Sequence, residues 1–159
     1  MTKNKKSHPL LKADKIKQLP KLQFSHPFNP NSEISGFSLS EAVGLQRIGF
    51  HLATIHPGKE SFIYHSHEFE EEFIYILSGK AIAEIDNEEF EIEPGDFMGF
   101  PTPSVPHHLR NPFEEDLIYI MGGEKREYEV VDFPNLKKRM FRNGQQMQIA
   151  DLNNLQSMG

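Results

Sequence analysis

Two histidines separated by one residue, His65 and His67, are the first feature of this sequence that could carry chemistry. Alternate side chains of a β-strand point to the same face, so both imidazoles can reach one point. Neutral imidazole is the commonest metal ligand, and another histidine, His107, lies forty residues beyond His67 and precedes a further β-type run. Three imidazoles and one carboxylate would leave open positions on a six-coordinate metal, and a catalytic metal needs such positions.

Four carboxylates follow the histidine pair within five positions, and only one of them is expected to complete such a ligand set. They are Glu68, Glu70, Glu71 and Glu72. A His-x-His pair on an exposed strand is more often two surface histidines, and an acidic run is more often a solvated loop. The pair by itself therefore leaves a metal site as the less favoured interpretation, and the surrounding elements have to decide.

The elements around these residues are predicted to be short β-strands from Leu45 to about Val131. Runs rich in β-branched and aromatic residues cover residues 48–55, 72–78, 80–86, 89–93, 97–100 and 117–121. Asp86-Asn87 is typical of a hairpin turn, and Pro94-Gly95-Asp96 fits a turn with proline first and glycine second. Regularly spaced short strands without a long helical period indicate a β-sandwich or a small barrel.

The two ends of the chain have a different composition. Residues 1–44 are predicted to form an extended, proline-containing arm with one helical turn, because Ser38 and Glu41 match a capping box and Gly44 follows. Residues 45–133 would be the β domain. Residues 134–159, polar and rich in Asn and Gln, are expected to form a tail with at most one edge strand.

Charge and composition exclude several classes of protein. The first 20 residues contain six lysines and one aspartate, whereas the rest contains 11 basic and 22 acidic residues, which argues against a nucleic-acid partner. No stretch approaches the roughly 20 apolar residues of a membrane span, and no secretory h-region is visible, so we expect a cytoplasmic protein that does not contact a membrane. The chain has no cysteine, which excludes disulfides, thiol catalysis and thiolate ligands.

Two motifs in order resemble those of the cupin family. The family's first motif is a glycine, five residues, His-x-His, three or four residues, Glu, six residues and Gly; its second is Gly, five residues, Pro-x-Gly, two residues, His, three residues and Asn. This sequence has Gly58, six residues, His65-Ser66-His67, four residues, Glu72, six residues and Gly79, and then Gly95, five residues, Pro101, five residues, His107, three residues and Asn111. One extra residue precedes each histidine motif, and Pro103 stands where the family prefers glycine.

The resemblance implies an all-β jelly-roll barrel, also called a double-stranded β-helix, with an extended N-terminal arm. It implies a metal site of His65, His67, Glu72 and His107, and it selects Glu72 because this glutamate lies six residues before Gly79. Strand alternation agrees, since it places Glu72 on the inner face and Glu71 on the other. His108, adjacent to a ligand on a strand, would be a rim or surface histidine. Inward apolar residues would line the cavity, although most of them are expected to be simply core: Ile63, Ile74, Ile76, Phe100 and Leu109.

The function implied by this resemblance is that of a metal-dependent enzyme acting on a small oxygenated molecule such as a sugar phosphate, in the manner of sugar-phosphate-isomerase-type cupins. The cofactor would be a divalent ion, Zn, Fe(II), Mn or Ni, and Glu70 or Glu71 is a candidate base. Alternatives are an iron-dependent dioxygenase or an oxalate-decarboxylase-like enzyme, and a non-catalytic metal-dependent binding module. A homodimer is expected, with the outward Phe73, Tyr75 and Leu77 in its interface. A basic residue beside the metal would favour an anionic substrate, with Arg47, Lys80 and Arg110 as candidates.

Overall fold

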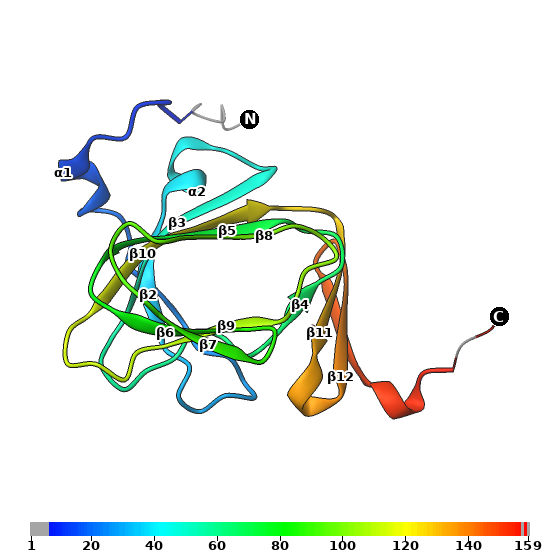
Figure 1. The fold of residues 1–159 in the computed structure, drawn as a ribbon. Helices are drawn as coiled ribbons and strands as arrows, with labels where there is room; N and C mark the ends of the chain where they lie inside the picture. The colour runs from blue at the N-terminus through cyan, green and yellow to red at the C-terminus, as the bar shows by residue number, and fades with distance from the viewer. Residues whose placement is uncertain (1–6, 157, 159) are drawn as a thin grey trace, which may run out of the picture.

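Two antiparallel sheets face each other across the main apolar core (Figure 1). The computed structural model describes residues 7–156 and residue 158. The larger sheet contains, in spatial order, β1 (Leu22–Phe24), β2 (Ile34–Ser38), β3 (Ile48–Ile55), β10 (Leu117–Glu124), β5 (Glu72–Ser78) and β8 (Phe97–Phe100). The smaller sheet contains β7 (Glu88–Ile92), β6 (Ala81–Ile85) and β9 (His107–Arg110). This arrangement confirms the predicted all-β jelly-roll class.

A third sheet stands at one end of these two layers (Figure 1). Its order is β13 (Gln146–Asp151), β12 (Lys138–Asn143), β11 (Tyr128–Phe133) and β4 (Ser66–His67). The short helical segments are α1 (Ala13–Ile16), α2 (Leu39–Val43), η1 (Pro134–Leu136) and η2 (Leu152–Asn154). No helix among the described residues is long and apolar enough to cross a membrane. The third sheet brings the end of the chain beside the His-x-His segment.

The strand alternation predicted for residues 72–78 is confirmed. Ile74 and Ile76 are buried in the core between the sheets, whereas Tyr75 and Leu77 are exposed on the outer face. β5 begins at Glu72, so the first side chain of this strand points inward with the two isoleucines. The alternation therefore aims Glu72 at the interior and leaves an apolar outer face.

Local turn chemistry forms the connections between these strands. Asp86 and Asn87 both have positive φ values, 49° and 65°, as the predicted hairpin turn between β6 and β7 requires. The side-chain oxygen of Ser38 accepts the backbone N–H of Glu41 at the start of α2, which is the predicted cap. Gly79 has φ +77°, and a Cβ there would lie 2.2 Å from the carbonyl oxygen of Asp116. Glycine is therefore required where β5 turns against the start of β10.

Both ends of the chain contain more sheet than their composition indicated. Within residues 1–44, β1 pairs with β2 and β2 pairs with β3, so an extended arm is not confirmed for residues 22–38. Within residues 134–159, β12 and β13 form a hairpin that pairs with β11, so the tail has two strands where at most one was expected. Backbone pairing with an existing edge stabilises both segments although few of their side chains are buried. The division of the chain at residues 44 and 133 stays a prediction.

Candidate metal centre

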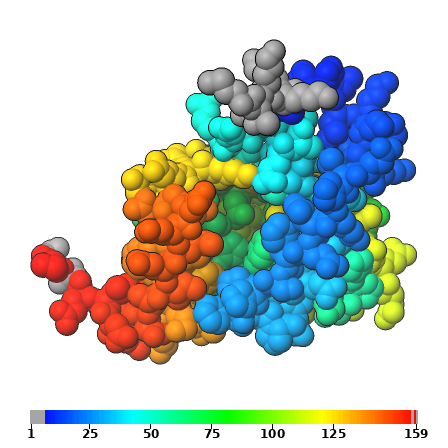
Figure 2. All heavy atoms as spheres, turned by 180° about the vertical axis from the view of Figure 1, so that it is seen from behind, coloured from blue at the N-terminus to red at the C-terminus, as the bar shows by residue number. Residues whose placement is uncertain are grey.

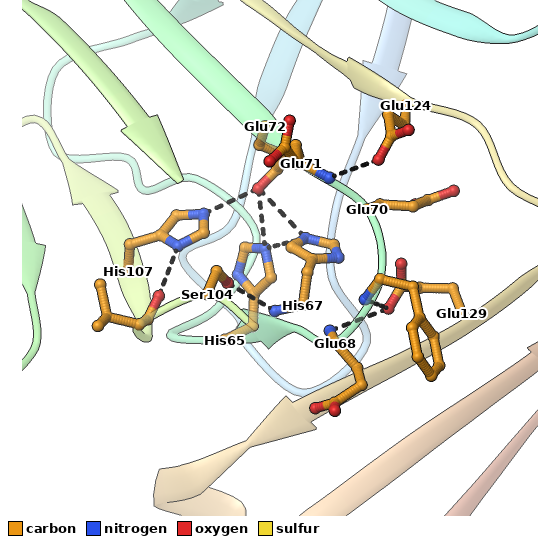
Figure 3. Close-up of polar contacts among 12 residues, drawn as sticks. His65, His67, Glu68, Glu70, Glu71, Glu72, Ser104, His107, Glu124 and Glu129 are labelled. Carbon is orange, nitrogen blue, oxygen red and sulfur yellow. Dashed lines mark hydrogen bonds and ion pairs between the residues drawn. The ribbon is translucent and has the colours of Figure 1, made fainter. Parts of the chain in front are cut away.

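The four side chains singled out by the motifs converge at one end of the barrel (Figure 3). His65 and His107 face each other as a cross-strand pair, because the N–H of each donates to the carbonyl of the other, at 3.2 and 2.8 Å. His67 lies two residues after His65, and its ring approaches from β4. Glu72 enters from the first position of β5. Three separate strands thus bring the four groups together.

The distances between ligand atoms are those of one compact cluster. The Nε2 atoms of His65 and His67 are 3.1 Å apart. The Oε2 atom of Glu72 lies 3.2 Å from Nε2 of His67, 2.9 Å from Nε2 of His107 and 3.9 Å from Nε2 of His65. Ligand atoms of His65, His67 and Glu72 all lie within 4.8 Å of one another. The Nε2 atom of His107 adjoins this group through Glu72.

Backbone carbonyls orient the imidazole rings of His65 and His107 through their Nδ1 atoms. Nδ1 of His65 lies 2.6 Å from the carbonyl oxygen of Ile63, and Nδ1 of His107 lies 3.1 Å from that of Val105. A carbonyl only accepts, so each Nδ1 carries a proton and each Nε2 faces the centre, where its lone pair would bind a metal ion. The ring of Phe100 stacks on His107, with ring centroids 3.7 Å apart. These contacts hold the donors in place before anything binds.

The ionisation of the cluster suits a divalent cation. Burial lowers the pKa of His65 to about 3, so this imidazole is neutral at physiological pH. Burial opposes ionisation of Glu72, but hydrogen bonds from His107 and His67 hold the pKa of this carboxyl well below its usual range. Burial likewise opposes a proton on His67, yet the hydrogen bond to Glu72 and its charge raise the pKa of that imidazole. An ionised carboxylate among buried imidazoles is a site that attracts positive charge, whether as a proton or as a metal ion.

The backbone of β10 lies close to the centre because it has glycine there. A Cβ at Gly123 would come within 2.7 Å of the carbonyl oxygen of Glu71 and 3.2 Å of Cγ of Glu72. The donor set of three imidazoles and one carboxylate, with two Nε2 lone pairs aimed inward by backbone carbonyls, fits zinc, iron(II), manganese or nickel. The residues present therefore fit the expected divalent ion.

The two candidate bases lie in different surroundings. Glu70 is buried, and its carboxylate accepts the backbone N–H of Arg126 at 2.6 Å and pairs with the guanidinium of Arg142. Glu71 is exposed, and its backbone N–H donates to the carboxylate of Glu124 at 3.2 Å. Both residues line hollows whose walls include Glu72. Of the two, Glu71 alone has a carboxylate without a side-chain partner among the described residues.

An open cavity of about 400 Å³ adjoins the cluster and is mostly apolar. It is lined by Ile48, Glu71, Glu72, Phe73, Phe97, Gly99, Phe100, Pro101, Gly123 and Glu124. Of the five apolar residues expected to line it, only Phe100 does so. Ile74, Ile76 and Leu109 are packed in the core between the sheets, and Ile63 packs against Val131 and Phe133. These four are core residues, as was expected for most of the set, because side chains fill the interior of a small barrel. The face seen in Figure 2 is hollowed between the N-terminal and C-terminal parts of the chain, which are blue and orange.

Some site residues differ from the sequence-based interpretation. His108 is buried, 8% exposed, with Nε2 3.5 Å from Glu60, so it is not a rim or surface histidine. The segment that carries Glu60 covers this side of β9, and alternation alone cannot show such a cover. Lys80 and Arg110 pair with glutamates of β7, and neither they nor Arg47 line a hollow that includes Glu72.

One basic residue that lines a hollow together with Glu72 was not singled out from the sequence. Lys125 and His51 line a second hollow of about 150 Å³ together with Glu70 and Glu72. Lys125 follows β10 directly, and its ammonium lies 3.6 Å from the carboxylate of Glu41. No local motif marks it, because only the pairing of β3 with β10 brings it beside His51.

Fold and site together define a small jelly-roll barrel with a histidine–carboxylate cluster at its mouth, and comparison with known proteins identifies the family. The cupin domain profile matches residues 51–123, which include the whole cluster. The structure is similar to that of a proposed sugar phosphate isomerase from Acidithiobacillus ferrooxidans, with 38% identity, a TM-score of 0.91, and coverage of 94% of this chain and 96% of the other. The chain belongs to the cupin superfamily and resembles its sugar-phosphate-isomerase-like members.

Two further similarities are less informative about function. The cupin-superfamily sugar phosphate isomerase of Silicibacter pomeroyi shares the fold, with a TM-score of 0.80, 18% identity, and coverage of 91% of this chain and 95% of the other. The uncharacterised protein MJ1618 of Methanocaldococcus jannaschii is 39% identical over 55 residues, which are 35% of this chain and 43% of that protein. The chain thus spans less than half the length of the curated relatives it matches.

Proposed function

We propose that this cupin is a metal-dependent enzyme that isomerises a small hydroxy-carbonyl compound, with sugar phosphates as the leading substrate class. The observation that carries the proposal is the convergence of His65, His67, His107 and Glu72 beside an open cavity. The similarity to the Acidithiobacillus protein over nearly the whole of both chains supports the same class of substrate. The four residues would hold the metal, which supplies Lewis-acid polarisation of a substrate oxygen when bound.

The protein's own groups would do the rest of the chemistry. An aldose–ketose interconversion moves one hydrogen between adjacent carbons and one between their oxygens, so no oxidant or reductant is consumed. Glu71 is the better placed of the two candidate bases, because it is exposed at the cavity wall whereas Glu70 is engaged by Arg142. Its carboxylate would take the proton from one carbon and return it to the next. Phe73, Phe97 and Phe100 would exclude water from the bound carbon chain.

An anionic group on the substrate would be bound at the second hollow. Lys125 and His51 line this hollow together with Glu70, Glu72 and Glu124, and none of the phenylalanines of the first cavity lines it. A lysine is a usual point-charge partner for phosphate. We therefore expect the phosphate of a substrate to lie against Lys125, with the carbonyl end toward the histidines.

The test is an isomerisation assay on a panel of aldose and ketose phosphates with purified, metal-reconstituted protein. We expect turnover of at least one pair, loss of that turnover in His67→Ala, and unchanged turnover in His8→Ala, which removes an exposed histidine remote from the cluster. Glu71→Gln should lower kcat, and Glu70→Gln should lower it less. No turnover across the panel by the native protein would refute the isomerase proposal.

The same preparation separates the alternatives. Oxygen consumption with iron(II) on phenolic, thiol or dicarboxylate substrates would indicate the dioxygenase or oxalate-decarboxylase class. Tight binding of a small molecule without turnover would indicate a non-catalytic binding module.

A homodimer in the cytoplasm remains part of the proposal. Tyr75 and Leu77 are exposed on the outer face of the large sheet, whereas Phe73, the third residue expected in the interface, is half-buried. An apolar sheet face of this kind is typical of a subunit interface. Light scattering coupled to sizing should give twice the mass of the chain, and a monomer would contradict the interface.

A further inference from the structure

The imidazole of His67 differs from those of His65 and His107 in the surroundings of its Nδ1 atom. Backbone carbonyls face Nδ1 of His65 and of His107. Nδ1 of His67 is buried and has no hydrogen-bond partner among the described residues. Its ring is therefore the one in the cluster whose orientation and tautomer the backbone does not set.

A second buried atom without a partner lies on the same side. Oε2 of Glu129, on β11, is also buried and unpartnered within the described part of the chain. Glu129 is 1% exposed, and ligand-type atoms of His67, Glu70 and Glu129 lie within 4.8 Å of one another. Figure 3 shows the nitrogen of His67 remote from Glu72 turned toward the side where Glu70 and Glu129 lie. A buried donor and a buried acceptor that face each other are complementary.

The other oxygen of Glu129 is held by the backbone. Oε1 accepts the N–H groups of Glu68 and Phe69, both at 3.1 Å, and that of Val130 at 2.8 Å. Three amide donors on one oxygen prevent this carboxylate from rotating. Oε2 is therefore presented in a fixed direction.

These acidic groups do not form a second cation site. The carboxylate of Glu70 is already paired with Arg142 and accepts the N–H of Arg126. Oε1 of Glu129 is occupied by three backbone donors. What remains open is one lone-pair oxygen opposite one imidazole nitrogen, which suits a proton better than a metal ion.

We propose that Glu129 is a positioning residue for the metal site: its Oε2 accepts the Nδ1 proton of His67 and so directs the Nε2 lone pair of His67 to the metal. This inference rests on the proposed metal site. It assigns to Glu129 the role that the carbonyls of Ile63 and Val105 have for the other two histidines. Carboxylates behind ligating histidines raise the basicity of the ligand and fix its ring.

The substitution Glu129→Gln distinguishes this role from a merely structural one. The three backbone N–H groups require an oxygen, so the glutamine amide should leave its oxygen with them and turn its NH2 toward His67. An NH2 group donates to Nδ1 and favours the tautomer with the proton on Nε2, which cannot bind metal. The backbone contacts survive, so the metal-free variant should melt within about 2 °C of the native protein.

The assay is zinc affinity by chelator competition on the full chain, with Glu68→Gln as the control that removes an exposed carboxylate beside His67. We expect Glu129→Gln to bind zinc about 10–100-fold more weakly than the native protein and the control to bind as the native protein does. In ¹H–¹⁵N spectra of the zinc-loaded native protein, His67 should show a protected Nδ1 proton. In Glu129→Gln that resonance should shift or vanish, while those of His65 and His107 stay.

The outcomes separate the two ideas. No zinc binding by the native protein would overturn both the metal site and this inference. Native binding together with equal affinity and an unchanged His67 resonance in Glu129→Gln would overturn the inference alone. Two zinc ions per chain with Glu70 and Glu129 as ligands would also overturn it.

Discussion

Replacement of Arg142 by methionine should destabilise the protein by more than its place near the end of the chain suggests. Arg142, on β12, pairs with Glu70 and donates to the carbonyl oxygen of Arg126 at 3.0 Å. Methionine keeps the packing of the aliphatic stem and removes the charge. The substitution leaves the carboxylate of Glu70, whose side chain is 9% exposed, without its counter-ion.

The size of the effect follows from burial. Removing one partner of a buried ion pair costs about 3–5 kcal/mol. The Arg142 side chain is 26% exposed, and Glu70 keeps the hydrogen bond from the Arg126 N–H, so we expect about 2–3 kcal/mol. For a chain of this size each kcal/mol lowers Tm by about 2–4 °C. The predicted decrease in Tm is therefore about 4–12 °C.

The chain offers a matched control on its surface. Arg110 also pairs with a glutamate, Glu89, but their side chains are 36% and 58% exposed. Arg110→Met should cost less than about 1 kcal/mol, as is usual for surface ion pairs. Both pairs join an arginine to a glutamate, so the comparison reports the effect of burial together with that of the Arg142 hydrogen bond to the Arg126 carbonyl.

Urea unfolding of the metal-free protein measures these free energies, and a double substitution checks their origin. Arg142→Met combined with Glu70→Gln removes the unpaired charge and should recover at least about 1 kcal/mol of the loss. If Arg142→Met costs no more than Arg110→Met, or if Glu70→Gln recovers nothing, the pair does not anchor the loop that carries the candidate bases.

Three further predictions follow from the site and its supports. Elemental analysis should find about one divalent ion per native chain and none in Glu72→Ala, because the carboxylate supplies the charge compensation; metal retained in the variant would contradict the ligand assignment. The pKa of His65 is about 3 in the folded protein and about 6.5 in the unfolded chain. As pH falls below about 6.5, the unfolded chain therefore binds a proton at this residue that the folded protein does not bind, and stability is lost on acidification. Between pH 6.5 and 5 the metal-free native protein should lose up to about 2 kcal/mol more than His65→Gln in urea melts, and equal losses would refute this assignment. Gly79→Ala should lower the free energy of unfolding by over about 2 kcal/mol, because its Cβ would clash with Asp116, whereas Gly144→Ala, with φ +60° and open space around it, should cost only about 1 kcal/mol; calorimetry that ranks them the other way would refute the close approach.

Local pattern in the sequence was sufficient for the barrel strands and most of their turns. Residues 48–55 and 72–78 were predicted as strands with the bounds that the structure shows, because alternation of apolar side chains is a local signal. The Asp86-Asn87 turn and the Ser38 cap are equally local, since each depends on a side chain acting on its own backbone neighbourhood. The resemblance to the cupin motifs, supported by strand alternation, singled out Glu72, and the structure shows this glutamate close to the histidines.

Only the tertiary structure shows what surrounds those residues. Glu129 and Arg142 lie some 60 to 70 positions from the loop they hold, and no periodicity connects such distant segments. The composition of residues 134–159 indicated a tail, but these residues form two strands. A strand whose backbone pairs with an existing edge needs few buried side chains of its own, so its composition can be as polar as that of a tail. The burial of His108 likewise depends on a covering segment that carries Glu60. The sequence by itself thus determined the strands and, through its resemblance to the cupin motifs, the four convergent side chains. The packing of distant segments decided what surrounds those side chains, including the proximity of Glu129 to His67.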